Sequence, residues 1–328
     1  MTFPLVSICV PTIGRLEYLS ATLQSLREQT YENYEVIVLD NASGPEAQSL
    51  LTEFVANHSN AQILRVNERL PMFTNFNRGI RAAVGEYVVF FHDDDHYDPR
   101  FLEAHVAVLE ANPQAAFAGS NWNMINGEGQ LTVRRRLIKR TGTWNGRDFI
   151  ERLVRRGRSE LATPALVFRR EVVKTRGFDE RCPIHWGDFT ILMRIAEQWD
   201  VAVVADPLFS WREHEQNSSK MPFSQSIPLR THVLHDYCSE YAVRHPEDLE
   251  FLNRLRSFVD RGHNRGLLWG WLVASDDTES RACRRLLEEA SCPMTVGLLS
   301  LLESVGLTVT CRRSLVPAAR HVIDLIGI

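Results

Sequence analysis

Three consecutive aspartates are the residues of this chain best suited to chemistry. Asp93, Asp94 and Asp95 follow the apolar run 87–91, which is typical of a strand buried on both faces. We expect the three carboxylates to meet solvent together at the carboxyl end of this strand, where open α/β sheets bind ligands. Side by side they repel one another unless a cation or hydrogen-bond donors offset their charge. Oxygen ligands of this kind suit Mg²⁺ or Mn²⁺, with a phosphate completing the shell. The alternative is an acidic turn that caps the next helix.

Polar side chains also follow the first two predicted strands. The first strand ends in Pro11 and Thr12 and the second in Asp40 and Asn41, so both loops should lie at the same sheet edge as the three aspartates. The Asp–Asn pair can accept hydrogen bonds from a base N–H and from ribose hydroxyls, which suits a nucleoside. The alternative is an Asx turn that leads into the helix starting at Pro45. Neither the G-x-G-x-x-G pattern of dinucleotide-binding folds nor the P-loop pattern occurs.

The elements that position these loops follow from the hydrophobic pattern. Through about the first 120 residues, short apolar runs alternate with helix-like segments, which predicts an α/β fold with a mostly parallel sheet and right-handed crossovers. From about Ile227 onward the alternation stops and the sequence reads helical to the end. The predicted strands are 6–10, 34–39, 63–66, 87–91 and 115–119, and the predicted helices are 16–29, 45–57, 76–83 and 100–112.

Composition and charge limit the function classes. A length of 328 residues suggests about two domains, and the 44% hydrophobic and 24% charged fractions are those of an ordinary globular protein. The net charge of −4 gives no general attraction to nucleic acid. The charge is uneven, because residues 134–181 hold 15 Lys and Arg against 6 Asp and Glu. This basic stretch is either a solvated face or a surface that meets the phosphates of a donor, a lipid-linked acceptor or an anionic membrane.

The cysteines and the ends of the sequence predict a cytoplasmic protein. The six cysteines lack the spacing of metal sites, so we expect reduced thiols. The N-terminus runs straight into a strand, without the basic segment and apolar core of a signal peptide. The longest apolar stretch near the end, 296–309, contains Glu303 and is too short to span a bilayer. We therefore expect neither export nor a transmembrane anchor.

A series of short motifs occurs in a fixed order along the chain. They are Ser7–Thr12, Leu26–Tyr31, Tyr34–Asn41, Asn77–Tyr87 with the aspartates that follow, Thr163–Arg170 and Gly177–Glu180. Together they resemble the inverting GT-A glycosyltransferases of family 2, which transfer a sugar from a nucleotide donor. The resemblance covers about residues 4–220.

The resemblance implies an α/β GT-A fold in which helices flank a mostly parallel mixed sheet. It implies a catalytic domain over residues 1–225, with nucleotide-sugar binding in 1–120 and the acceptor side in 121–225. A helical region, 226–328, would follow this domain.

The resemblance also implies a nucleotide-sugar site and a metal site at the matching positions. Asp94 would be the principal ligand of Mn²⁺ or Mg²⁺, with Asp95 supporting the metal shell and Asp93 lying toward the ribose. His214, in an Arg-x-His segment similar to the family's, would reach the metal or the diphosphate. The residues expected to bind the nucleotide sugar are Pro11, Thr12, Arg15, Asp40, Asn41, Asn77, Asp93 and Asp94, and those expected to bind the metal are Asp94, Asp95 and His214.

Two positions of this site depart from the family's pattern. Asn41 stands where members often carry a second Asp, which keeps a hydrogen-bond acceptor but loses a charge. His92 replaces the first carboxylate of the metal motif.

A second catalytic element is expected at Trp186–Arg194, which is similar to the family's Glu-Asp-x-x-Leu-x-x-Arg helix start. Asp188 takes the Asp position and would be the general base that removes the proton of the acceptor hydroxyl, in a single displacement with inversion. The alternative role of Asp188 is an N-cap. Gly187 stands where the family has Glu, and Trp186 could stack on a sugar ring, so both are expected on the acceptor side.

The predicted function is metal-dependent, inverting transfer of a sugar from a nucleotide sugar, a UDP-sugar being favoured. The acceptor would be a hydroxyl of a saccharide or lipid-linked saccharide, in bacterial cell-surface polysaccharide or glycoconjugate synthesis. One alternative is a non-catalytic nucleotide- or sugar-binding protein of the same fold. Another is a sugar-phosphate nucleotidyltransferase, whose Gly-rich first loop is absent because only Gly14 and Arg15 occur here.

The C-terminal helices leave two interpretations open. They either pack on the catalytic domain and shape its acceptor side, or attach peripherally to an anionic membrane at its inner face. An apolar face and basic patches underlie both interpretations. The apolar face comprises Leu298, Leu299, Leu302 and Val305, and the basic residues are Arg281, Arg284, Arg285, Arg312 and Arg313.

Overall fold

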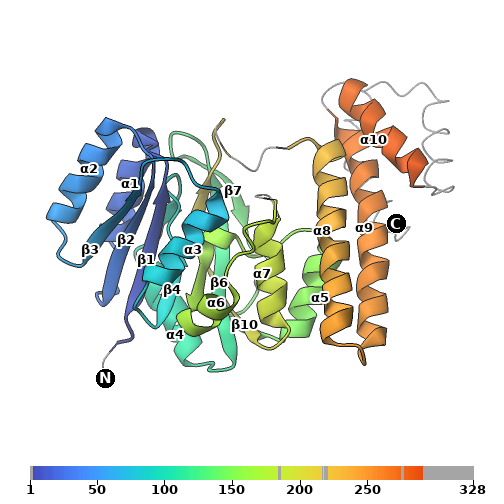
Figure 1. Ribbon diagram of the computed structural model, residues 1–328, viewed down its shortest axis with the longest axis horizontal. Helices are drawn as coiled ribbons and strands as arrows, with labels where there is room; N and C mark the ends of the chain where they lie inside the picture. Colours follow the sequence, from blue (N-terminus) through green and yellow to red (C-terminus); the bar gives the residue numbers. More distant parts are fainter. Residues whose placement is uncertain (1–2, 184–185, 216, 218–220, 275–276, 291–328) are drawn as a thin grey trace. The chain divides into compact units, whose positions relative to one another are not determined.

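The computed structural model describes residues 3–183, 186–215, 217, 221–274 and 277–290. The chain forms two compact units, which are described separately. The sheet unit comprises Met1–Ile150 and Ser159–Ser218, and the helical unit comprises Glu151–Arg158 and Ser219–Ile328. Figure 1 labels the elements of both units.

Strands and helices alternate through the first part of the sheet unit, as the hydrophobic pattern predicts. Every strand and helix expected there is present. The main differences are that one helix begins at Met72 and that the last strand runs on to Ile125. The elements are β1 (Val6–Thr12), α1 (Leu16–Arg27), β2 (Tyr34–Asn41), α2 (Pro45–Ala56), β3 (Ala61–Val66), α3 (Met72–Ala82), β4 (Tyr87–Phe90), β5 (His96–Tyr97), α4 (Phe101–Glu110) and β6 (Ala115–Ile125).

The rest of the sheet unit adds strands of both directions. Helix α5 (Gly146–Arg156) begins in the sheet unit and ends in the helical unit. The remaining elements are β7 (Leu131–Arg135), β8 (Gly142–Trp144), the 3₁₀ turn η1 (Thr163–Ala165), β9 (Leu166–Arg169), α6 (Arg170–Arg176), α7 (Gly187–Ala196) and β10 (Asp200–Arg212).

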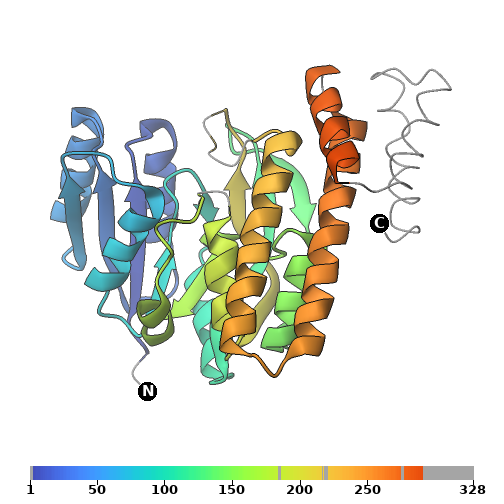
Figure 2. The ribbon, with the colours of Figure 1, turned by 45° about the vertical axis from the view of Figure 1, so that its right-hand side comes forward.

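One mixed sheet joins these strands in the order β3-β2-β1-β4-β9-β6-β10-β5. Strands β3, β2, β1 and β4 are parallel, β9 is antiparallel to both of its neighbours, and β6 and β10 are parallel. The predicted GT-A architecture, helices around a mostly parallel mixed sheet, is therefore confirmed (Figure 2).

The strand register brings three loops to one edge of the sheet. Thr12 pairs with Asp40 at the ends of β1 and β2. Cys9 pairs with Phe90 at the end of β4, and the Phe91 N–H donates to the Cys9 carbonyl, 2.9 Å away. The loops after β1, β2 and β4 therefore leave the sheet side by side, as their sequence positions predict.

Helices cover both faces of this part of the sheet. Leu19, Leu23 and Leu26 of α1 are buried against one face. Helix α3 lies on the other face and approaches the strands at Gly79. A Cβ atom at Gly79 would lie 2.8 Å from both Cys9 Sγ and Leu39 Cδ1, so only glycine permits this contact.

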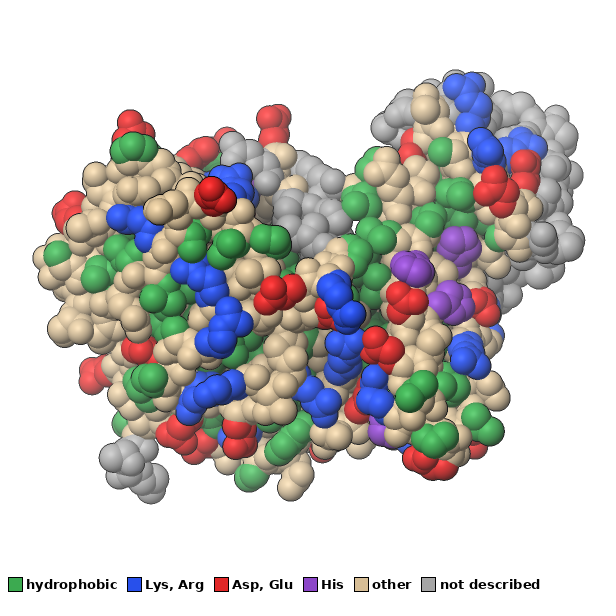
Figure 3. Space-filling model, in the orientation of Figure 1, with side chains coloured by type: hydrophobic (Ala, Val, Ile, Leu, Met, Phe, Trp, Pro, Cys, Tyr) green, Lys and Arg blue, Asp and Glu red, His purple; other side chains and the backbone are tan. Residues whose placement is uncertain are grey.

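Part of the basic stretch 134–181 lies on α6 of the sheet unit, and α3 adds further basic residues from outside that stretch. Lys and Arg side chains gather over α3 and α6 in Figure 3. Helix α3 contributes Arg78 and Arg81, and α6 contributes Arg170, Lys174 and Arg176.

The helical unit confirms a helical C-terminal region. It contains α8 (Phe223–Arg244), α9 (Leu249–Val273) and α10 (Asp277–Glu289). A small core includes Ile227, Trp271 and Leu287. Among the described residues, no helix combines the length and the apolar character needed to cross a bilayer.

The predicted apolar face of the tail, together with Arg312 and Arg313, lies outside the described residues. Arg281, Arg284 and Arg285 lie on α10.

Candidate active site

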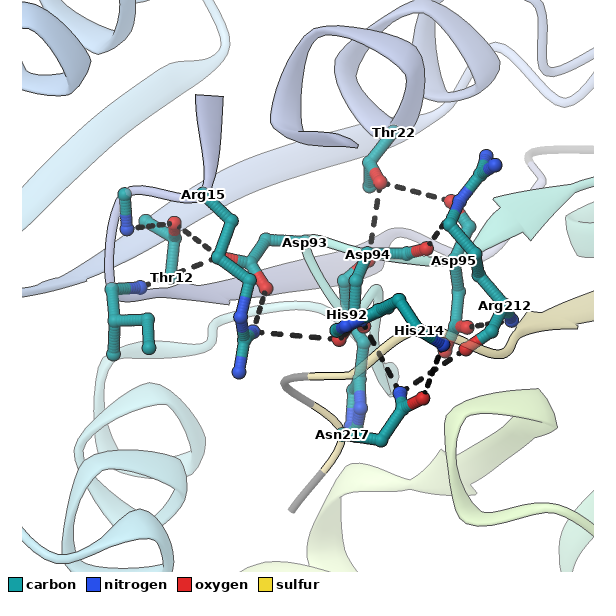
Figure 4. Close-up of polar contacts among 12 residues, drawn as sticks. Thr12, Arg15, Thr22, His92, Asp93, Asp94, Asp95, Arg212, His214 and Asn217 are labelled. Carbon is teal, nitrogen blue, oxygen red and sulfur yellow. Dashed lines mark hydrogen bonds and ion pairs between the residues drawn. The ribbon is translucent and has the colours of Figure 1, made fainter. Parts of the chain in front are cut away.

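The turn His92–Asp95 follows β4 and is held in place by neighbouring elements. The hydroxyl of Tyr97 in β5 accepts the His92 N–H at 2.8 Å. The hydroxyl of Thr22 in α1 donates to the Asp95 carbonyl at 2.9 Å, and Arg212 Nε at the end of β10 donates to the Asp94 carbonyl at 2.9 Å. Figure 4 shows the contacts of Thr22 and Arg212 with the turn. The backbone of the turn is therefore fixed before any ligand binds.

Asp93 points toward the loop after β1. Its Oδ2 accepts hydrogen bonds from the Thr12 hydroxyl at 2.6 Å and the Ile13 N–H at 3.3 Å, and its Oδ1 lies 2.8 Å from Arg15 Nη1. Burial raises the pKa of Asp93 and the nearby Asp94 raises it further, whereas Arg15 and Thr12 oppose this shift. Both oxygens of Asp93 therefore have partners within the protein.

Asp94 is the half-buried member of the three. Its Oδ2 lies 3.4 Å from Arg15 Nη1 and 3.1 Å from His214 Nε2. The side-chain oxygen of Asn217 accepts a hydrogen bond from the backbone N–H of His214 at 2.6 Å, and the His214 ring stacks on Tyr18 with centroids 4.7 Å apart. His214 thus orients Asp94 from the far end of β10 (Figure 4).

Two buried atoms in this turn have no hydrogen-bond partner in the structure. Asp95 Oδ1 accepts the Arg212 N–H at 2.9 Å, but Asp95 Oδ2 has no partner, and neither has His92 Nε2. Ligand atoms of His92, Asp94 and Asp95 all lie within 4.8 Å of one another. Buried groups are normally satisfied, so these orphaned atoms and the donor set around them fit a divalent cation.

Electrostatics supports the same conclusion. Burial raises the pKa of Asp95 well above its usual range, and the neighbouring Asp94 adds to the shift. Burial lowers the pKa of His92 to about 4, so its ring is neutral near neutral pH and retains a lone pair.

The expectation that the three aspartates meet solvent together is wrong. Asp93 is only 3% exposed and Asp95 only 1%. Consecutive side chains of the turn point in different directions, and Arg15 and Arg212 provide partners on opposite sides. None of the three caps the next helix either, because the N-cap of α4 is Arg100 and has no side-chain cap.

A pocket of about 280 Å³ opens beside this turn. It joins the loops after β1, β2 and β4 with the start of α3. Predicted site residues that line it are Pro11, Thr12, Arg15, Asn41, Asp93 and Asp94. Further lining residues, not assigned to the site from the sequence, are Ile13, Arg69, Leu70, Met72, Asn75, Phe76 and His92.

Asp40 and Asn41 make contacts within the protein. Asp40 is fully buried and accepts the Ser43 N–H at 3.0 Å and Arg65 Nε at 2.6 Å. The bond to Ser43 closes a local turn before α2, but it spans three residues instead of the two of the Asx turn expected as the alternative. The amide of Asn41 pairs with both backbone groups of Leu70, accepting at 2.8 Å and donating at 3.0 Å. Asn41 thereby fixes the segment that forms one wall of the pocket.

Asn77 lies outside the pocket lining, whereas Asn75 belongs to it. The Asn77 side chain is buried and binds both backbone groups of Phe178, at 2.8 and 2.9 Å. Residues two positions apart on a helix point in widely different directions, so α3 can present only one of the two asparagines to the pocket.

Asp188 lies in the first turn of α7, two residues after the N-cap Trp186, so it is not the N-cap that the alternative expected. Its Oδ2 accepts a hydrogen bond from the Thr163 hydroxyl at 2.5 Å, and its Oδ1 accepts the Phe189 N–H at 3.0 Å. Burial raises the pKa of Asp188, and the Thr163 hydrogen bond opposes the shift. Thr163 is a partner that the sequence did not identify, because it lies in a separate turn.

Gly187 has no room for the Glu of the family's motif. A Cβ atom there would lie 2.1 Å from the Phe73 ring, which itself stacks on Phe178 with centroids 5.2 Å apart. Trp186 packs edge-on against Phe189, with centroids 5.0 Å apart, and its buried Nε1 has no hydrogen-bond partner.

Comparisons with known proteins identify the family of this chain. A family model described as glycosyl transferase family 2 matches residues 7–177. The putative glycosyltransferase EpsH from Bacillus subtilis is 29% identical over 103 residues, which cover 31% of this chain and 30% of EpsH. Glycosyltransferase AglE from Haloferax volcanii is 26% identical over 133 residues, which cover 40% of this chain and 41% of AglE. The matched region therefore spans less than half of these relatives.

Solved structures share the fold. TarS from S. aureus has a TM-score of 0.64 at 17% identity, covering 88% of this chain and 82% of that fragment. A Pyrobaculum calidifontis mannosyltransferase, solved with GDP-Man and Mn²⁺, has a TM-score of 0.58 at 19% identity, covering 96% of this chain and 86% of that chain. The family model covers more than half of the sequence, and the sheet has the GT-A arrangement. This chain belongs to glycosyltransferase family 2.

Proposed function

We propose that this protein transfers a sugar from a nucleoside diphosphate donor, a UDP-sugar being favoured, to a hydroxyl of a saccharide or lipid-linked saccharide. One observation carries the proposal: the pocket lies where three strand ends bring the Arg15 loop, Asn41 and the acidic turn together. Related structures support the donor class, because TarS was solved with UDP-GlcNAc and the mannosyltransferase with GDP-Man.

The pocket lining suits a nucleotide sugar. Arg15 and Arg69 offer positive charge for a diphosphate, while Leu70, Met72 and Phe76 offer apolar surface for a base. We assign Asp40 and Asn77 a supporting role, since the structure gives their side chains partners within the protein.

Asp94 and Asp95 are the proposed carboxylate ligands of a divalent cation, Mn²⁺ or Mg²⁺. When bound, such an ion neutralises charge on the departing diphosphate. His214 contacts Asp94 Oδ2 directly, so we propose that it orients this ligand. Arg15 lies near the same oxygen and adds positive charge on the pocket side.

Asp188 is the proposed general base. The acceptor oxygen attacks the anomeric carbon, a new C–O bond forms, and the bond to the diphosphate breaks on the opposite face. The hydroxyl proton passes to the Asp188 carboxylate. The raised pKa of Asp188 increases its affinity for that proton, and the Thr163 hydroxyl holds the carboxylate in one orientation. This single displacement inverts the anomeric configuration.

A relative supports the biosynthetic context. The putative teichuronic acid biosynthesis glycosyltransferase TuaG of Bacillus subtilis is 24% identical over 117 residues, which cover 46% of TuaG. We propose that this chain likewise acts in cell-surface polysaccharide or glycoconjugate synthesis. We place it in the cytoplasm, with the helical unit as the part that contacts the inner face of the membrane.

In the described part of the helical unit, two of the basic residues of α10 pair with acidic residues of the same helix. Arg284 and Arg285 on α10 pair with Glu288 and Glu289, at 2.8 and 3.0 Å, which offsets their charge. Failure of the full chain to sediment with anionic vesicles would refute the membrane contact while leaving the transfer reaction intact.

The test is nucleotide release from a panel of UDP-, GDP- and dTDP-sugars with Mn²⁺ or Mg²⁺. We expect metal-dependent release from one donor, suppressed by EDTA and lost in Asp94→Ala. In Asp188→Asn, transfer should collapse while donor binding survives. If the wild type and Asp188→Asn both bind the donor and neither transfers the sugar, the protein is a binding module of the same fold. No release combined with no metal-dependent nucleotide binding would overturn the proposal.

A further inference from the structure

His92 is the member of the acidic turn that the proposed function leaves unexplained. Its ring nitrogen Nε2 is buried without a partner, and it lies in the same turn as the orphaned Asp95 Oδ2. Asp95 is 1% exposed, so its free oxygen cannot turn to solvent. Two orphaned atoms in one turn cost stability unless something binds between them.

We propose that His92 is a protein ligand of the cation, together with Asp94 and Asp95, and that its nitrogen makes the site prefer Mn²⁺ and similar transition ions over Mg²⁺. The ligand atoms of the three residues lie within 4.8 Å of one another. The inference rests on the proposed function in assigning a cation to this turn, but metal binding can be measured without any transfer.

The position of the His92 ring is well defined. Its backbone N–H donates to the Tyr97 hydroxyl at 2.8 Å, which fixes the start of the side chain. The ring itself meets Phe76 edge-on, with centroids 5.6 Å apart and planes at 67°. A ligand that is held in place on two sides loses little conformational freedom when a metal binds, so the nitrogen is preorganised.

The chemistry of the donor set determines which ion it favours. Mg²⁺ prefers oxygen ligands and dehydrates reluctantly. An imidazole nitrogen binds later transition ions increasingly well, and Mn²⁺ accepts mixed nitrogen and oxygen ligands. A site with one nitrogen and two carboxylates should therefore separate Mn²⁺ from Mg²⁺ more strongly than a site of carboxylates alone.

His214 is the competing source of a nitrogen ligand. Its Nε2 lies 3.1 Å from Asp94 Oδ2 and 3.3 Å from Asn217 Nδ2, so this nitrogen already has partners. His92 Nε2 has none. We therefore assign the metal-bound nitrogen to His92 and the orientation of Asp94 to His214.

The experiment uses Mn²⁺ alone as the probe on the full chain. Pulsed EPR detects ¹⁴N coupled to bound Mn²⁺, and competition with Mg²⁺ gives the relative affinity. We compare the wild type with His92→Asp, His214→Asn and His96→Gln. His96 is a matched control, because it is an exposed histidine four residues from His92.

We expect the ¹⁴N coupling in the wild type, in His214→Asn and in His96→Gln, and its loss in His92→Asp while Mn²⁺ still binds. The preference for Mn²⁺ over Mg²⁺ should narrow about tenfold in His92→Asp. If that variant does not fold, as judged by circular dichroism, His92→Gln removes the ring with a side chain of similar length.

The inference is overturned if bound Mn²⁺ shows no ¹⁴N coupling in the wild type, if the coupling survives in a folded His92 variant, or if Mn²⁺ does not bind. Loss of the coupling only in His214→Asn would assign the ligand to His214 instead. Failure of the proposed function is distinct, because it appears as absent nucleotide release with Mn²⁺ binding intact.

Discussion

The ends of β2 and β4 lie at the same edge of one sheet and both carry acidic residues, yet their side chains are used differently. At the end of β2, each side-chain nitrogen and oxygen atom of Asp40 and Asn41 has a hydrogen-bond partner in Ser43, Arg65 or Leu70. At the end of β4, the turn leaves buried His92 Nε2 and Asp95 Oδ2 without partners. A position at a strand end therefore does not tell whether a polar residue supports the fold or binds a ligand. The difference lies in whether its buried nitrogen and oxygen atoms already have hydrogen-bond partners.

This difference has an energetic basis. A buried polar atom without a partner costs on the order of 1–3 kcal/mol, and adjacent like charges add to that cost. The end of β2 avoids the cost by closing a turn. The end of β4 carries it, which is expected where a ligand offsets the cost on binding.

The largest effect should come from Asp94→Ala at the end of β4. We expect turnover to fall about 10³-fold, because the variant loses a carboxylate that faces the pocket. Stability without metal should change by less than about 1 kcal/mol, because relief of the repulsion with Asp93 and Asp95 offsets the loss of the contacts with Arg15 and His214. Steady-state kinetics and thermal melting measure the two. A large loss of stability would instead show that Asp94 mainly supports the fold, as Asp40 does.

Asp188→Asn tests whether a carboxylate with hydrogen-bond partners can still be catalytic, because both oxygens of Asp188 already accept hydrogen bonds. We nevertheless expect transfer to fall about 10²–10³-fold, since asparagine cannot accept the hydroxyl proton. Donor affinity, measured by calorimetry, should stay at the wild-type value. If transfer survives, Asp188 belongs with Asp40 as a scaffold residue, and a base must be sought elsewhere.

Asp40→Asn should show the opposite behaviour. The variant keeps an acceptor for the Ser43 N–H but loses the 2.6 Å ion pair with Arg65. Because the Asp40 carboxylate is fully buried and Arg65 is partly exposed, we expect a loss of about 1–3 kcal/mol in the free energy of unfolding. Turnover per folded molecule should stay within about threefold of wild type. Chemical denaturation gives the first quantity, and Arg65→Gln is the matched control. Turnover that collapses at unchanged stability would contradict the scaffold role.

The features that depend on the spacing of apolar residues were predictable from the sequence. Apolar runs located the strands and helices of the first part of the sheet unit except the two-residue strand β5, and strand ends located the edge where the pocket lies. Side-chain direction was not predictable in the same way. Asn75 and Asn77 are both polar residues of α3, and only packing decides that Asn75 lines the pocket.

Contacts between distant segments explain what else the sequence could not provide. Gly187 replaces the Glu of the family's motif, and its reason, the Phe73 ring, lies more than a hundred residues away. Asp93 and Asp95 have partners in Arg15, from the loop after β1, and in Arg212, from the end of β10. Such pairings follow from the tertiary fold and leave no local signal.

Thr163→Val should have the smallest effect. It tests how a hydrogen bond within the protein sets the pKa of the Asp188 carboxylate. The Thr163 hydroxyl donates to Asp188 Oδ2 at 2.5 Å and lowers the pKa of Asp188, against the upward shift from burial. Removing the donor therefore raises this pKa further. A general base must be ionised, so activity is lost as pH falls through its pKa, and the acid limb of kcat/KM should move to higher pH. On that limb the rate should fall by less than about tenfold, with the alkaline plateau kept. Thr163→Ser retains the hydroxyl and should keep the wild-type profile. A parallel drop at every pH would mean that Thr163 acts only through packing, and the comparison between satisfied and unsatisfied carboxylates would then not extend to Asp188.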